Sequence, residues 1–276
     1  MTASPNPPHP PLEKGGGRGD FVEKGREEKS SQPPFEKGGQ GGFLGEGRFI
    51  MEVLDSFPVS VDPAEVMTRL RNRSELAGTI RDLVAEVQRL ARPKAVYDVC
   101  YVDEKGPDWV MVNGVRFRSH VLRVNLDPVN RVFPYVATCG TEVEAIAVPE
   151  DDLVAAYCLD TIKRSLVTMA RGYLEAYLTK RYALGQFSRM SPGSLTDWPI
   201  TEQQPLFSLF GNVERLIGVK LTENCLMIPV KSVSGILFPT EVKFENCQLC
   251  PRPICEGRRA PYDPALAEEY RQKTLG

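Results

Sequence analysis

Three cysteines near the end of the chain have the residue type and spacing to bind a metal. Cys247, Cys250 and Cys255 fall within nine residues of a Pro-rich stretch, in the order C-x-x-C-x-x-x-x-C. Thiolates at this spacing converge on zinc or on an iron–sulfur cluster, and the spacing does not distinguish the two. A closed tetrahedral site needs a fourth thiolate, for which Cys225 is the favoured donor, with Cys139 behind it. The alternative is a set of reduced thiols without metal.

An arginine followed by a glycine-containing loop could bind a small anion or zwitterion. The sequence reads RMSPG from Arg189 to Gly193. Arginine forms paired hydrogen bonds with carboxylates, and glycine lets the backbone approach a ligand closely. The alternative is a surface arginine before an ordinary Ser-Pro-Gly turn, and the motif alone favours that alternative.

A third segment, Ser232 to Gly235, reads SVSG and enters an apolar run. Strand alternation places Ser232 and Ser234 on one side, and Gly235 removes bulk beside them. This suits the close approach of a large flat ligand whose polar rim contacts the hydroxyls. A strand with solvent-facing serines and a bulge at Gly235 is an equal alternative.

Composition excludes several classes of function. The formal net charge is −2 over 276 residues, with mixed signs, so we expect no nucleic-acid partner. No apolar run approaches the roughly 20 residues that span a bilayer, and the N-terminus carries no secretion signal, so we expect no membrane association and a cytoplasmic location. The sequence has only two histidines, so a hydrolase triad with a histidine base is improbable.

Composition and periodicity divide the chain into three parts. Residues 1–50 contain an imperfect repeat rich in Pro, Gly, Lys and Glu. A segment of this composition buries too little apolar surface to fold, so we expect it to be disordered. Residues 51–245 show the apolar periodicity of a folded domain. Residues 246–276 form a cysteine-containing C-terminal extension.

Within the predicted domain, helical periodicity covers 62–90 and 150–184, and β texture covers 95–147. The β region includes HVLRVNL at 120–126 as a strand and Asn113-Gly114 as a hairpin turn, which together predict an antiparallel meander. We therefore predict an α+β fold, with a twisted antiparallel sheet and helices packed against it.

Three motifs together resemble the reactivation domain of cobalamin-dependent methionine synthase. That family carries an Arg-x-x-x-Gly-Tyr loop, a Leu-Thr-Glu-Ser turn and a Ser-Val-Ser-Gly strand. The counterparts follow in the same order with nearly unchanged spacing at Arg189 to Ser194, Leu221 to Asn224, and Ser232 to Gly235. The clear match covers about 190–240, and the resemblance implies the α+β fold of methionine synthase activation domains.

The resemblance also implies a function. In that family the domain binds S-adenosylmethionine and caps the corrin, so that cob(II)alamin, once reduced by one electron, is methylated back to methylcobalamin. By resemblance, Arg189 and Gly193 would hold S-adenosylmethionine. The other residues that we assign to the cofactor-binding site are Ser194, Glu223, Ser232, Ser234 and Gly235.

Two positions depart from the family pattern. Ser194 stands where the family has its loop tyrosine, and Phe244-Glu245 stands where it has a Tyr-Tyr pair. The catalytic modules of methionine synthase are absent from this sequence. We therefore predict a stand-alone reactivation-type protein for a cobalamin-dependent methyltransferase. Its partner, which carries the cobalamin, is a corrinoid protein or a shortened methionine synthase.

The alternative function is an iron–sulfur or zinc-containing module that binds a corrinoid protein or delivers electrons to it, without binding a methyl donor. In that case the thiols are its working parts. An iron–sulfur centre at the cysteine cluster would deliver the low-potential electron itself, whereas structural zinc would only tie the C-terminal extension to the domain.

Overall fold

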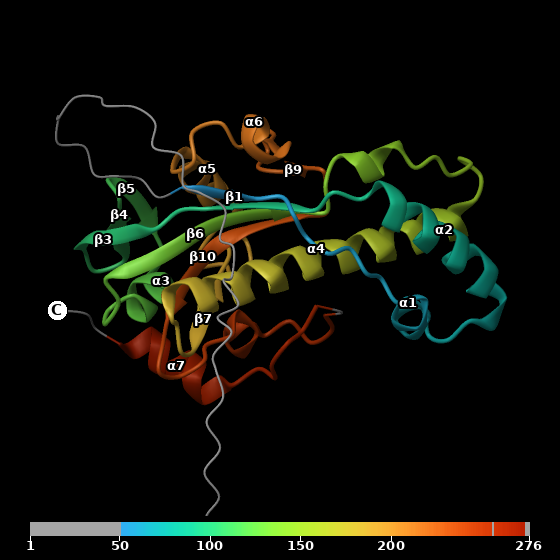
Figure 1. The fold of residues 1–276 in the computed structure, drawn as a ribbon. Coiled ribbons are helices and arrows are strands. Elements are labelled where there is room, and N and C mark those ends of the chain that lie inside the picture. Colours follow the sequence, from blue (N-terminus) through green and yellow to red (C-terminus); the bar gives the residue numbers. More distant parts are fainter. Residues whose placement is uncertain (1–50, 256, 274–276) are drawn as a thin grey trace, which may run out of the picture. The chain divides into compact units, whose positions relative to one another are not determined.

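The computed structural model describes residues 51–255 and 257–273 (Figure 1). The expected disorder of 1–50 lies outside these residues. The strands are β1 (Glu52–Leu54), β2 (Lys94–Tyr97), β3 (Cys100–Lys105), β4 (Trp109–Val112), β5 (Val115–Arg118), β6 (Arg131–Thr138), β7 (Phe187–Met190), β8 (Lys220–Leu221), β9 (Met227–Ile228) and β10 (Ser232–Pro239). The α-helices are α1 (Pro63–Arg69), α2 (Ala77–Leu90), α3 (His120–Asn125), α4 (Leu153–Tyr182), α5 (Gln203–Ser208), α6 (Val213–Ile217) and α7 (Pro264–Gln272). The 3-10 turns are η1 (Ser74–Leu76), η2 (Glu142–Ala145), η3 (Ile200–Glu202) and η4 (Asn246–Leu249).

Eight strands form one antiparallel sheet around β6. Its path runs β1-β2-β6-β3-β4-β5, while β10 pairs with both β6 and β7. β2 and β3 follow one side of β6 in succession, and β10 follows the other side. The predicted antiparallel sheet with packed helices is confirmed. The predicted meander is wrong beyond β3-β4-β5, because the chain returns through α3 and places β6 beside β2 and β3.

The hairpin and the strand predicted in this region have different outcomes. Asn113 and Gly114 join β4 to β5 with φ values of 45° and 76°, as the Asn-Gly signal predicts. The strand predicted over 120–126 is wrong, because most of that segment forms α3. Ser119 caps this helix by accepting a hydrogen bond from the Leu122 amide at 2.9 Å.

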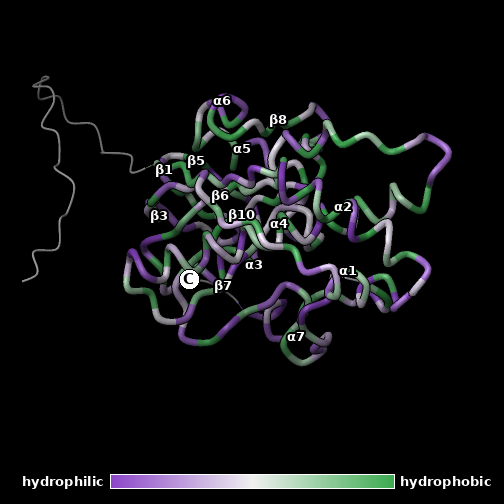
Figure 2. Tube along the Cα trace, turned by 45° about the vertical axis from the view of Figure 1, so that its right-hand side comes forward, coloured by the Kyte–Doolittle hydropathy of each residue, from purple (hydrophilic) through white to green (hydrophobic). Residues whose placement is uncertain are grey.

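The long helix α4 covers one face of the sheet (Figure 1). Asp152 caps it by accepting from the Ala155 amide at 2.8 Å, and Ala183 ends it in the left-handed conformation. Its C-terminal half packs on the sheet through Ala170, Leu174 and Leu178. Its N-terminal half packs against α1 and α2. The buried residues of α2 recur at helical spacing, and Figure 2 shows hydrophobic and hydrophilic residues alternating along this helix.

The opposite face of the sheet is covered by α5 and α6 (Figure 1). There Val96 and Val136 of the sheet pack against Phe207, Val213 and Ile217. Within 51–255 and 257–273, none of the helices combines the length and hydropathy that a membrane span requires.

The described part of the C-terminal extension is attached to the domain. The ring of Tyr270 in α7 stacks on Phe244 with centroids 5.5 Å apart, and its hydroxyl donates to Asn125 Oδ1 at 3.1 Å. η4 and α7 are joined by the Asp263 amide, which donates to the Gln248 carbonyl at 2.8 Å. The extension therefore lies against the α3 region of the domain.

Candidate functional site

The loop after β7 is a closed turn, and Arg189 lies before it in the strand. The sequence places Arg189 in a loop, but the structure pairs it with Leu237 of β10. The Gly193 amide donates to the Trp198 carbonyl at 2.7 Å. Gly193 has φ of +80°, and a Cβ added there would lie 2.7 Å from Ile200 Cδ1. The left-handed backbone conformation therefore favours glycine at this position, and a side chain there would also displace the end of Ile200.

The Arg189 side chain forms an ion pair with α4. Its Nη1 lies 2.7 Å from Glu175 Oε1, and Arg171 Nε lies 3.7 Å from the same oxygen. These side chains are only 13% (Arg189), 20% (Glu175) and 21% (Arg171) exposed. Arg171 Nε is buried without a hydrogen-bond partner among the described residues. Burial, followed by the charge of Arg189, lowers the pKa of Arg171.

A second ion pair adjoins the first. Arg259 Nε lies 2.7 Å from Glu245 Oε2. Burial raises the pKa of Glu245, but the hydrogen bond and charge of Arg259 outweigh it, so that the pKa lies below its ordinary value. The charge of Arg189 also lowers the pKa of Glu245, and the charge of Arg259 lowers the pKa of Arg171. We call Arg171, Glu175, Arg189, Glu245 and Arg259 the arginine–glutamate cluster; three cations and two anions leave it with one positive charge.

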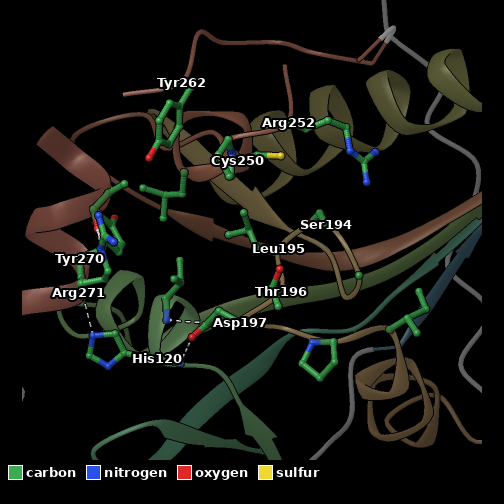
Figure 3. A pocket seen from close by; sticks show the side chains of 17 residues that line it. His120, Ser194, Leu195, Thr196, Asp197, Cys250, Arg252, Tyr262, Tyr270 and Arg271 are labelled. Atoms are coloured by element: carbon green, nitrogen blue, oxygen red, sulfur yellow. Dashed lines mark hydrogen bonds between the residues drawn. The ribbon is translucent and has the colours of Figure 1, made fainter. Parts of the chain in front are cut away.

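A cavity of about 640 Å³ lies between the Gly193 loop and the C-terminal extension (Figure 3). Thr196 and Asp197 of the loop face Tyr262 and Tyr270 of the extension across it (Figure 3). The lining residues are His120, Val121, Gly193, Ser194, Leu195, Thr196, Asp197, Pro199, Ile200, Leu249, Cys250, Pro251, Arg252, Tyr262, Ala267, Tyr270 and Arg271. Of the predicted site residues, Gly193, Ser194 and Cys250 line this cavity, whereas Arg189 does not.

The two serines of the SVSG segment are buried on the α5 side of the sheet. Ser232 donates to the Pro229 carbonyl at 2.7 Å and lies 2.9 Å from the Thr138 hydroxyl. Ser234 Oγ lies 3.4 Å from Gln203 Oε1 of α5. Both hydroxyls are thus bonded within the protein, and as predicted they share one face.

Gly235 allows β10 and β7 to pack closely. It pairs with Tyr135 in continuous register, without the bulge considered above. A Cβ added at Gly235 would lie 2.3 Å from the Met190 carbonyl oxygen and 2.8 Å from Ser191 Oγ. The absence of a side chain therefore allows β10 to approach the start of the Gly193 loop.

The turn between β8 and β9 carries Glu223 and Cys225. Glu223 is exposed, and Cys225 is buried with φ of +60°. The Cys225 carbonyl accepts a hydrogen bond from the Gln203 side chain at 3.4 Å. These residues consequently belong to the α5 side of the sheet, together with Ser232 and Ser234.

The four cysteines of the predicted metal site have different surroundings. Cys247 Sγ accepts from the Arg259 amide at 3.4 Å, Cys250 lines the cavity, and Cys255 is exposed. Over 51–255 and 257–273, no three His, Cys, Asp or Glu residues are grouped so that they could hold a metal ion. The metal site at Cys225, Cys247, Cys250 and Cys255 stays a prediction that this geometry does not support. Cys100 and Cys158 are buried, as predicted for core thiols.

Sequence reasoning missed the arginine–glutamate cluster. Arg171 and Glu175 are four residues apart on a predicted helix, which is a readable signal for an ion pair. That this pair faces Arg189 depends on the packing of α4 against β7, which no local pattern encodes.

Comparisons with known proteins give a family and a fold that this chain resembles. Residues 173–245 match the family described as vitamin B12 dependent methionine synthase, activation domain, and this range includes Glu175, Arg189 and Glu245. No curated protein sequence matches the chain. A solved structure of the MetH reactivation domain bound to AdoHcy shares the fold, with a TM-score of 0.52 and 16% identity over 72% of this chain and 81% of that chain. The chain therefore resembles the reactivation domain of cobalamin-dependent methionine synthase, in sequence over residues 173–245 and in fold over most of the length that the structure describes.

Proposed function

We propose that this protein is a reactivation factor for a cobalamin-dependent methyltransferase, and that it binds S-adenosylmethionine as methyl donor. The family match over 173–245 carries the proposal, because it spans the α4 half that bears Glu175, the strand that bears Arg189 and the Gly193 loop. The partner in this proposal is a cytoplasmic protein that carries the cobalamin, either a corrinoid protein or a shortened methionine synthase.

The arginine–glutamate cluster has the donor set that a zwitterionic methyl donor needs. Arg171 Nε is a buried donor without a hydrogen-bond partner in the described residues, and a carboxylate is the group that satisfies a guanidinium in paired geometry. Glu175 and Glu245 provide negative charge for the ammonium and sulfonium groups. The alternation of charges in the cluster therefore suits a ligand that carries both signs.

The chain's own residues position and shield this ligand in the proposed reaction. Glu175 holds the Arg189 guanidinium in place at 2.7 Å, and the hydrogen-bonded Gly193 loop begins two residues beyond it. S-adenosylmethionine supplies the methyl group and leaves as S-adenosylhomocysteine, while a low-potential one-electron donor supplies the electron that the partner's cob(II)alamin requires. The protein thus contributes binding and orientation.

The test is a calorimetric titration of S-adenosylmethionine into anaerobically purified protein whose iron and zinc have been assayed. We expect saturable binding in the wild type and about tenfold or weaker affinity in Arg189→Ala, since a hydrogen bond to a charged group is lost. Arg81→Ala, an exposed arginine on α2, is the matched control and should bind like the wild type. Absence of binding in the wild type contradicts the proposal, and with iron present it would favour the electron-delivery alternative.

A further inference from the structure

The C-terminal extension forms one wall of the cavity, although it lies beyond the family match, which ends at residue 245. This wall is held firmly. Tyr270 is fixed by its hydroxyl on Asn125 and by its carbonyl, which lies 2.8 Å from His120 Nε2. The wall opposite the Gly193 loop is therefore anchored to the domain through Tyr270.

Arg258 holds the loop that carries Arg252, a residue of the cavity lining. The Arg258 guanidinium donates to the carbonyls of Cys247 at 3.3 Å, Cys250 at 3.4 Å and Ala260 at 3.3 Å, and also to that of Arg252. A guanidinium with several carbonyl acceptors holds the backbone of a loop in a single arrangement. The backbone at Arg252 is thereby held by the Arg258 guanidinium.

Some polar groups around the cavity already have hydrogen-bond partners among the described residues, and others do not. Asp197 accepts from the Ser119 hydroxyl and from the His120 and Val121 amides, so its charge is committed to the start of α3. In contrast, within the described part of the chain the Arg252 guanidinium and the hydroxyls of Thr196 and Tyr262 have no hydrogen-bond or ion-pair partner. These three groups are available to a ligand.

The rest of the lining is mainly apolar. Leu195, Pro199 and Ile200 contribute from the loop side, and Leu249 and Pro251 contribute from the extension. Small-molecule sites are typically concave, apolar and of roughly 300–1,000 Å³, with a few polar groups that fix orientation. The cavity of about 640 Å³ has this character.

We propose that the C-terminal extension supplies ligand-binding side chains, and that the cavity takes a small organic molecule with an apolar body and an anionic group. Arg252 binds the anionic group, Tyr262 and Thr196 donate hydrogen bonds, and the apolar lining holds the apolar body. The proposed function assigns S-adenosylmethionine to the arginine–glutamate cluster, none of whose residues lines the cavity. The binding chemistry of the cavity therefore does not depend on that function.

The experiment uses 1-anilinonaphthalene-8-sulfonate, an aromatic anion, titrated by fluorescence into the full-length native protein. We expect one site per chain, with affinity at least about tenfold weaker in Arg252→Ala because a charged hydrogen bond is lost. Tyr262→Phe should weaken it less. Arg81→Ala removes an exposed arginine elsewhere and should change nothing, and thermal melts should show that all variants are folded.

Alkylation of Cys250 locates the probe, because this thiol lines the cavity. Bound probe should slow Cys250 modification, measured by peptide mass spectrometry. Unchanged affinity in Arg252→Ala, or binding that leaves Cys250 unprotected, overturns the inference. A parallel titration of S-adenosylmethionine separates the two proposals. Probe binding without S-adenosylmethionine binding leaves the cavity site standing and refutes the proposed function, and the converse result refutes only the cavity site.

Discussion

Replacement of Gly235 by alanine should destabilise the protein through one steric conflict. The added Cβ would lie 2.3 Å from the Met190 carbonyl oxygen, whereas ordinary van der Waals contact begins at about 3.4 Å. The methyl group therefore requires a displacement of about 1 Å. The nearest atom belongs to backbone in β7, which is paired with β10 itself, so the conflict cannot be relieved by rotating a side chain.

The expected cost follows from these contacts. Overpacking of this kind costs about 1–3 kcal/mol, and loss of glycine entropy in the unfolded chain offsets less than about 1 kcal/mol. For a domain of this size, each kcal/mol corresponds to about 2–4 °C in Tm. We therefore expect Gly235→Ala to melt several degrees below the wild type, with a lower urea midpoint and an unchanged slope.

Gly172→Ala is the matched control within the same molecule. Gly172 lies inside α4, and a Cβ there meets nothing within 4 Å. Alanine should stabilise the helix by about 0.5–1 kcal/mol. If Gly235→Ala is as stable as the wild type while Gly172→Ala behaves as stated, the close approach of β10 and β7 is not what requires glycine, and the reasoning is refuted.

Three further predictions concern the cluster and the thiols. Glu175→Gln should destabilise the fold by about 2 kcal/mol in chemical denaturation, less than for a fully buried pair because the side chains are partly exposed; an unchanged midpoint would show that the pair is dispensable. The folded-state pKa of Glu245 lies below its ordinary 4.5, so Glu245 stabilises the protein above that pH and loses its effect as pH falls through the folded value. The stability gap between wild type and Glu245→Gln should therefore shrink between pH 5 and pH 3, and a constant gap would contradict this. Alkylation should modify exposed Cys255 rapidly and Cys139 only on unfolding, because burial raises the pKa of Cys139 to about 11; rapid labelling of Cys139 in the native protein would show that its pocket opens.

The sequence predicts those parts of the fold that local chemistry specifies. The Asn113-Gly114 turn and the long helix α4 follow from residue preferences and periodicity, and both are present. The apolar residues of the segment at 120–126 fit a strand as well as a helix, so the pattern alone predicts a strand there. Its helical state depends on capping by Ser119 and on Asp197, which comes from 76 residues later in the chain to accept from the Val121 amide.

The candidate site shows the same limit. Arg189 is readable from its motif, but its placement in β7 depends on pairing with β10. Glu175 becomes its partner only through the packing of α4 on the sheet. The cavity is harder to predict from the sequence, because the loop and the extension that form its walls are distant in the chain. Its unpaired polar groups can be recognised only when the partners of the other polar groups are known.

The two departures from the methionine synthase pattern have one physical explanation. Ser194, at the position of the family's loop tyrosine, accepts a hydrogen bond from Asn246, the first residue of the C-terminal extension. Glu245, at the position of the Tyr-Tyr pair, holds Arg259 of the extension, and Phe244 stacks on Tyr270. Both departures are thus contacts with the extension. The Ser194 hydroxyl is the acceptor that the Asn246 side chain uses in this contact. These contacts join the extension, which lines the cavity, to the segment that matches the activation-domain family.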